Sequence, residues 1–320
     1  MSLLRFVSLA VILSPLFLSA DSSVAQEYPN KTVRIVAASA GSGGDFTARL
    51  IATSISAPLG QPVIVENRGT GFIPAEVVVK SPPDGYTVLV QGGSAWVNPL
   101  LQRAPYDAER DFSPIILISR DVNVLAIHPA LPVKSVKELI ALAKARPGDL
   151  NYASASSGST NHLAAELFKS ITGTNIVRVP YSGGARAVTS VISGEAQVIV
   201  MDAGLVLPHA KSGRLRALAV TSAEPTRLAP GLPTLASSGV PGYESTGVTG
   251  MLAPAKTPAA AITRLNQEVM RLISRQEVKD RFFDMGAETV GSTPDQFTAK
   301  VKSDIVKWSQ VIKDAGIKAD

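Results

Sequence analysis

The sequence predicts an α/β protein built as two lobes with a ligand cleft between them. Apolar runs alternate with segments of helical period from about residue 26 onward, which is typical of repeated strand–helix units. A second observation concerns the turns between them. Short apolar runs break into Gly/Ser-rich turns and then open helix-like segments at residues 34–45, 150–160 and 176–184. Each such turn would place unpaired backbone N–H groups and a positive dipole end at a helix start, which suits an anion.

The first 25 residues are predicted to be a signal peptide. Arg5 supplies the positive charge, residues 6–18 are mostly apolar, and Ser23-Val24-Ala25 offers small residues at a cleavage site, so cleavage is expected after Ala25. A membrane anchor is the alternative. However, the apolar run is shorter than the ~18–20 residues that a span requires. Export is therefore expected.

The first lobe is expected to contain three short strands and an amphipathic helix. Apolar residues recur at helical spacing from Phe46 to Ile55, and Gly60 closes that helix. Extended apolar stretches on both sides of Arg120 and Asp121 are interpreted as a crossing between lobes. The three strands are indicated at residues 33–37, 63–65 and 86–90.

The second lobe repeats the strand–loop–helix pattern. Ser135 is expected to cap a helix, with Glu138 at the capping-box position and Pro147-Gly148 at its end. The remaining elements are expected at 150–170, 176–192, 198–201, 215–220, 251–253, 258–273 and 294–315. This order divides the chain into a signal peptide (1–25), the first part of lobe one (26–126), lobe two (127–246) and the return to lobe one (247–320).

Composition favours a small anionic ligand over nucleic acid. The chain has 31 Lys and Arg against 26 Asp and Glu, a formal net charge of +5, and its basic residues are scattered. Aromatic residues make up only 5% of the sequence, so base-stacking platforms are not evident. With no cysteine and only isolated histidines, we expect no disulfide, no metal and no cofactor.

The first Gly/Ser-rich turn supplies the first candidate binding loop. Its residues are Ser39, Ala40, Gly41, Ser42, Gly43, Gly44 and Asp45. A dinucleotide fingerprint is the competing interpretation, but Phe46 stands where its third glycine would fall. Asp45 could cap the helix or accept a hydrogen bond from the ligand, and the sequence leaves both roles open.

Further candidates come from both lobes. Asp202 follows an expected strand, where it would be a cleft residue or a turn and helix cap, and these readings are equally good. His162, just inside the second helix, is expected to be structural. The other proposed ligand-binding residues are Ser94, Ser156, Gly158, Ser159, Thr160, Tyr181 and Gly183.

Several stretches of the chain are similar to a known family. They are residues 59–68 (LGQPVIVENR), 83–87 (PDGYT), 215–222 (LRALAVTS), 240–244 (VPGYE) and 285–288 (MGAE). On these motifs the chain resembles the periplasmic solute-binding receptors of tripartite tricarboxylate transporters, the Bug family, from about Tyr28 to Ile317. The first loop departs from the family pattern Pro-Phe-x-Pro-Gly-Gly, because both prolines are missing and only the glycines and Asp45 remain.

The resemblance implies a type II-like periplasmic binding protein, a monomer located in the periplasm. It would bind a small mono- or dicarboxylate in the inter-lobe cleft, through backbone amides and bridging waters, and deliver it to membrane permease subunits. Two other functions remain open: an exported hydrolase or isomerase with Asp45 or Asp202 as general base, or a ligand-sensing receptor for a signalling partner. The absence of an adjacent His, Cys or metal cluster argues against the enzyme.

Overall fold

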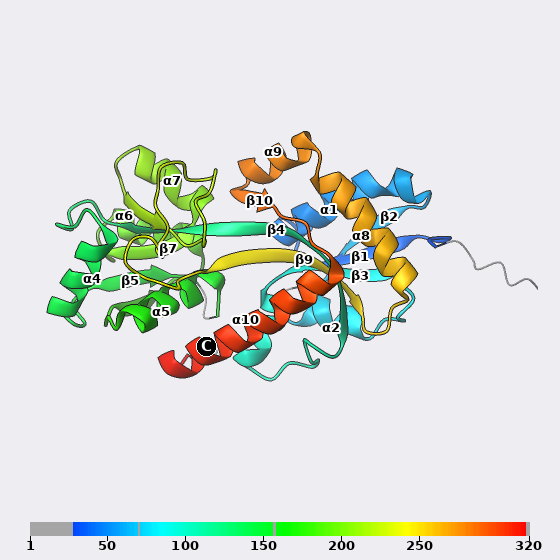
Figure 1. The fold of residues 1–320 in the computed structure, drawn as a ribbon, viewed down its shortest axis with the longest axis horizontal. Coiled ribbons are helices and arrows are strands. Elements are labelled where there is room, and N and C mark those ends of the chain that lie inside the picture. The colour runs from blue at the N-terminus through cyan, green and yellow to red at the C-terminus, as the bar shows by residue number, and fades with distance from the viewer. Residues whose placement is uncertain (1–27, 70, 156–157, 318–320) are drawn as a thin grey trace, which may run out of the picture.

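Two lobes lie side by side and are joined by two long strands, β4 (Phe112–Ile127) and β9 (Thr246–Pro254) (Figure 1). The computed structural model describes residues 28–69, 71–155 and 158–317, so the expected signal peptide lies outside the described residues. None of the helices within these ranges combines the length and the apolarity needed to cross a bilayer.

The first lobe is a sheet in the order β2-β1-β3-β9-β4 with helices on both faces. Side chains alternate along its central strand β1 because successive residues of a strand point to opposite faces. Ile35 belongs to the core under α1 and α8, whereas Val36 packs with Ala75 and Val78 of α2. The elements of this lobe are β1 (Val33–Ala37), α1 (Gly43–Leu59), β2 (Val63–Asn67), α2 (Ile73–Val79), β3 (Thr87–Gly92), α3 (Ser94–Val97), η1 (Asn98–Leu100), α8 (Ala259–Ile273), α9 (Gln276–Asp284) and β10 (Ala287–Thr289).

The second lobe is built around the order β4-β7-β5-β6, with β8 paired to the other edge of β4. Strands β5, β6 and β7 are parallel, and their carboxyl ends point toward the first lobe. The parallel strands β1 and β3 of the first lobe point the opposite way, with their carboxyl ends toward the second lobe. The elements are α4 (Val136–Ala145), β5 (Asn151–Ser154), α5 (Thr160–Thr172), β6 (Val177–Pro180), α6 (Gly184–Ile192), β7 (Val198–Asp202), α7 (Ala203–Lys211) and β8 (Arg216–Val220).

The two joining strands form one ribbon that belongs to both lobes. β4 pairs with β9 as far as Val122, and from Asn123 onward it pairs with β7 and β8. The stretches predicted on either side of Arg120-Asp121 are thus one continuous strand. The predicted boundary between lobe one and lobe two, after residue 126, falls inside this strand. β9 begins at Thr246, earlier than the predicted residue 251, since pairing with β4 outweighs the weak strand propensity of its glycines.

Contacts between the lobes lie on both sides of this ribbon. The last helix, α10 (Pro294–Ala315), packs on the first lobe through Phe297 against Trp96, with ring centroids 5.6 Å apart. Farther along, α10 contacts α5 of the second lobe. On the other side, the α-carbon of Gly286, just before β10, approaches Gly204 at the start of α7 so closely that a methyl group at Gly286 would lie 3.1 Å from the Gly204 nitrogen.

Glu288 of β10 connects three segments near the ribbon. Its Oε2 accepts hydrogen bonds from the Arg120 guanidinium at 2.9 and 2.8 Å, and its Oε1 accepts one from the Thr226 hydroxyl at 2.7 Å. Burial alone would raise the pKa of Glu288, but these hydrogen bonds outweigh it and hold the pKa below its usual value.

Glu288→Gln is expected to lower the free energy of unfolding by about 1–2 kcal/mol, because it removes hydrogen bonds to a charged acceptor. A depressed carboxyl pKa contributes stability above the ordinary Glu pKa, and this contribution is lost as the pH falls through the folded-state pKa. The difference between wild type and variant in urea unfolding should therefore stay nearly constant from neutral pH to about pH 5 and shrink as the pH falls from there toward about pH 3. A difference that stays constant over this range would contradict the assigned role of the carboxylate.

Candidate functional site

Two cavities lie between the lobes, beside the β4–β9 ribbon. Cavity A measures ≈ 530 Å³ and is lined by Gly43, Gly44, Thr47, Gly92, Ser119, Asp121, Asp202, Gly204, Leu205, Thr249, Phe282, Asp284, Met285, Gly286 and Ala287. Cavity B measures ≈ 220 Å³ and is lined by Gly93, Ser94, Val97, Asn98, Gly158, Ser159, Thr160, Leu163, Ser245, Thr246, Gly247, Val248, Asp304 and Trp308. Both cavities take residues from both lobes.

The first lobe contributes the start of α1 to cavity A. Ser42 is the N-cap residue, and its hydroxyl accepts a hydrogen bond from the Asp45 N–H at 3.1 Å. Gly43 and Gly44, the first two residues of the helix, line the cavity. Their N–H groups donate to no acceptor in the described part of the chain. The positive end of a seventeen-residue helix therefore faces the cavity.

The second lobe contributes a matching helix start. β7 ends at Asp202, and Gly204 and Leu205 in the first turn of α7 line the same cavity. The segment between α9 and β10 closes one rim, next to Gly204. Cavity A thus lies between the N-termini of two helices that belong to different lobes, an arrangement that favours negative charge.

The ribbon forms the remaining wall of cavity A and separates it from cavity B. Asp121 and Gly247 are cross-strand partners, so their α-carbons present substituents to the same face. A methyl group at Gly247 would lie 3.2 Å from Asp121 Oδ2 and 3.7 Å from Thr160 Cγ2. Gly247 therefore lies at the boundary between the two cavities, and its missing side chain leaves space between Asp121 of cavity A and Thr160 of cavity B.

Two carboxyl groups face cavity A without a cation. Asp121 makes no hydrogen bond or ion pair with the described residues, and burial together with the charge of Asp202 raises its pKa to about 6. Burial also raises the pKa of Asp202, although hydrogen bonds from Asn161 and from its own amide oppose this effect. The neighbouring Arg120 is held by Glu288. No Lys or Arg is among the cavity-lining residues in the described ranges.

Cavity B is lined by hydroxyl groups. Ser94 comes from the β3–α3 junction, and Ser159 is the N-cap of α5, where its hydroxyl accepts a hydrogen bond from His162 N–H at 3.3 Å. His162 is buried, and its Nδ1 accepts a hydrogen bond from Gly158 N–H at 3.1 Å, which supports its predicted structural role. Gly158 has φ +73°, and a β-carbon there would overlap the Leu101 side chain.

Seven of the predicted residues line one of the two cavities. They are Asp202, Gly43 and Gly44 in cavity A, and Ser94, Gly158, Ser159 and Thr160 in cavity B. Ser156 lies outside the described residues. The others line neither cavity: Ser39, Ala40, Gly41, Ser42, Asp45, Tyr181 and Gly183. Tyr181 instead packs against the apolar core of the second lobe.

Asp45 stabilises its own loop. Its oxygens accept hydrogen bonds from Gly41 N–H at 2.9 Å and Asn67 Nδ2 at 2.8 Å, and Arg49 Nε lies 2.9 Å away. Burial opposes its charge, but these donors outweigh burial and lower its pKa. Of the two roles that the sequence left open for Asp45, the structural one fits these contacts, and a lowered pKa makes it a poor general base.

Asp121 is the charged residue deep in cavity A that sequence reasoning missed. The sequence indicated a charged pair inside an extended apolar stretch, which was interpreted only as a crossing between lobes. A charge inside such a stretch is itself a signal, since an unpaired carboxylate is costly on a buried strand unless it faces a cavity.

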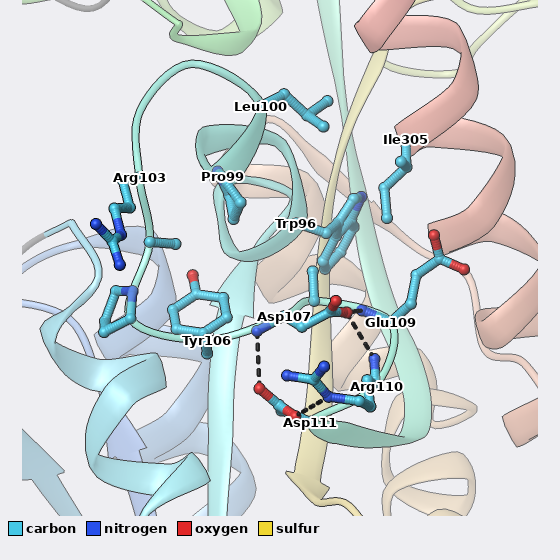
Figure 2. Close-up of a pocket in the computed structure, with 13 residues that line it drawn as sticks. Trp96, Pro99, Leu100, Arg103, Tyr106, Asp107, Glu109, Arg110, Asp111 and Ile305 are labelled. Carbon is cyan, nitrogen blue, oxygen red and sulfur yellow. Dashed lines mark hydrogen bonds and ion pairs between the residues drawn. The ribbon is translucent and has the colours of Figure 1, made fainter.

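A larger hollow of ≈ 620 Å³ lies outside the cleft, between α10 and the segment that leads into β4 (residues 99–111). Figure 2 shows two hydrogen bonds to the Asp111 carboxylate: its Oδ2 accepts from Asp107 N–H at 2.8 Å, and its Oδ1 accepts from Arg110 Nε at 3.0 Å. The hollow involves one lobe and α10 only.

Within the described ranges, no group of three or more His, Asp or Glu side chains is arranged to hold a metal ion.

Comparison with known proteins identifies the family. The sequence profile of a family described as "Tripartite tricarboxylate transporter family receptor" matches residues 47–317. The chain belongs to this family. The match begins just after the first loop, where the sequence departs from the family pattern. The protein BugT of Bordetella pertussis is 34% identical to this receptor over 319 residues, 98% of this chain and 96% of that protein.

Solved structures of relatives share the fold. R. palustris Rpa4515 with adipate is 35% identical, with a TM-score of 0.76 over 92% of this receptor and 100% of that chain. MatC from Rhodopseudomonas palustris with bound malate is 26% identical, with a TM-score of 0.72 over 89% and 100%. A ligand-free TctC solute binding protein from Polaromonas has a TM-score of 0.82 at 25% identity over 90% and 99%. The predicted two-lobed α/β fold of the periplasmic binding protein type is confirmed.

Gly158→Ala is expected to lower the free energy of unfolding by about 2–3 kcal/mol, since it combines a positive φ with overlap against Leu101. Adding Leu101→Ala should remove the steric part of this cost relative to Leu101→Ala alone and leave about 1 kcal/mol of backbone strain. Urea unfolding of the four proteins in this cycle measures both parts. Strictly additive effects would show that the two residues do not touch in solution.

Proposed function

We propose that this receptor binds a small organic mono- or dicarboxylate in cavity A and delivers it to the membrane subunits of a tripartite transporter. The observation that carries the proposal is the pair of helix N-termini, α1 and α7, that face one cavity from different lobes. Backbone N–H groups and hydroxyls can hold a carboxylate without a fixed cation. The relatives crystallised with adipate and malate support a carboxylate ligand.

Binding would also drive closure of the lobes. An anion that contacts both helix starts at once binds the closed arrangement better than the open one, and this differential affinity is what shifts the equilibrium. The hydroxyl groups of Ser94, Ser159 and Thr160 in cavity B would extend the site for a longer ligand, because Gly247 leaves space at the boundary between the two cavities.

The same proposal makes the protein an exported, monomeric, periplasmic receptor without catalytic activity. The predicted signal peptide supports export. Among the described residues, Asp121 and Asp202 are the titratable groups set deep in the site, and neither carboxyl is hydrogen-bonded to the hydroxyl groups of Thr47, Ser119 or Thr249 that line the same cavity. Binding without bond-breaking needs no base–nucleophile pair.

A screen of organic acids tests this function. We expect at least one small carboxylate to raise the melting temperature, with about 2.7 kcal/mol of stabilisation at a concentration 100-fold above its dissociation constant. Native mass spectrometry of protein purified without refolding should detect a bound acid, and the acid should be recovered unchanged. Turnover of the acid by the protein alone would favour the enzyme instead.

Gly43→Val should weaken carboxylate binding about tenfold or more with little loss of stability. No atom lies within 4 Å of a β-carbon at Gly43, so the side chain would be accommodated in the fold but would stand at the cavity wall. Ala40→Val is the matched control, since Ala40 is exposed in the same loop and lines neither cavity. Equal affinity of both variants would remove α1 from the site.

A further inference from the structure

We propose, on the basis of the function above, that the natural ligand carries an ammonium or other cationic group as well as its carboxylate, and that Asp121 and Asp202 select it. The two ends of such a ligand would have different partners in cavity A. Its carboxylate would lie at the N-termini of α1 and α7, and its cation would lie between the two aspartates on the ribbon side.

The lining of cavity A separates donors from acceptors. The donors are backbone N–H groups at Gly43 and Gly44, in the first turn of α1, and at Gly204, in the first turn of α7. The acceptors are the carboxyl groups of Asp121 on β4 and Asp202 at the end of β7. A ligand with two carboxylates has no use for the second set, whereas a ligand with an ammonium group satisfies both.

Charge balance favours the same ligand class. Two helix starts supply about half a positive charge each, while Asp121 and Asp202 bring two negative charges and Asp284 adds a third at the exposed rim. No cation among the described residues offsets them, because Arg120 is paired with Glu288. The empty cavity is therefore negative overall, which disfavours a dianion and suits a zwitterion.

The geometry around Asp121 leaves its carboxylate available. Its side chain has no partner among the described residues, and Gly247 opposite it leaves room where a side chain would stand. The titratable groups that line the cavity with it are Asp202 of β7 and Asp284 of α9. Neither of them is a cation.

The competing possibility is a dicarboxylate bound by a protonated aspartic acid. The pKa of Asp121, raised to about 6 by burial and by Asp202, makes the two cases distinguishable by pH. A cation requires the ionised carboxylate, so its binding should weaken as the pH falls below about 6. A second carboxylate would require the protonated form, so its binding should strengthen over the same interval.

The test compares linear acids of increasing chain length, each with a terminal ammonium, a terminal carboxylate or a terminal methyl group. Calorimetric titration of the intact mature protein should show about tenfold or greater preference for the ammonium form at the best length. Tighter binding of the dicarboxylate, with affinity rising toward acid pH, would overturn this inference and leave the proposed function standing. If no acid of any type binds, both fail.

Asp121→Asn tests the residue itself, since it keeps the shape and removes the charge. The variant should lose the preference for the ammonium form and lose the acid-side pH dependence of its binding. Asp314→Asn makes the same charge change at an exposed position near the end of α10 that lines neither cavity, and should behave as wild type. If Asp121→Asn does not fold, the wild-type preference and its pH profile still decide the question. A folded Asp121→Asn variant that keeps the full preference would refute the assignment.

Discussion

The rest of the structure depends on one constraint, the pairing of β4 with β9 in a ribbon that runs through both lobes. Because β4 continues from the sheet of the first lobe into that of the second, the two sheets have a fixed register relative to each other. That register brings the carboxyl ends of the parallel strands to the same place from opposite directions. The starts of α1 and α7, which belong to different lobes, then face one cavity.

The hydrogen-bond donors of the cleft come mostly from backbone groups, and this explains why no Lys or Arg lines cavity A in the described residues. Helix starts provide donors whose positions are fixed by the fold, so no lysine or arginine is needed to attract an anion. Asp121 on the ribbon and Asp202 at the end of β7 would then disfavour simple anions. A site of this kind can reject a ligand of the wrong charge distribution while keeping the same scaffold as its relatives, because selectivity depends on a few side chains on otherwise common strands.

The sequence was sufficient for most of the fold. Clear periodicity gave β1 at residues 33–37 and α10 at residues 294–315, and the Ser135 cap and the Gly60 end of α1 were also found. It missed α2, α9 and the first half of β9, where Gly247 and Gly250 have weak strand propensity and the segment is held in the sheet by its pairing with β4. Loop composition pointed to Gly43 and Gly158, each of which lines one of the two cavities. It could not identify Asp121, whose role depends on which strand and which face bring it to the cleft.

The path of α10 limits how the receptor can move. A hinge of two adjacent strands leaves rotation about one axis largely unopposed, but α10 is anchored by Phe297 on one lobe and contacts α5 on the other. Three connections that do not lie on one line resist a wide hinge opening, so the easier motion is a small shear of the second lobe along the helix. Access for the ligand then lies on the side away from α10, past the close approach of Gly204 and Gly286. In this receptor α10, which lines cavity B but not cavity A, governs the direction from which a ligand enters cavity A.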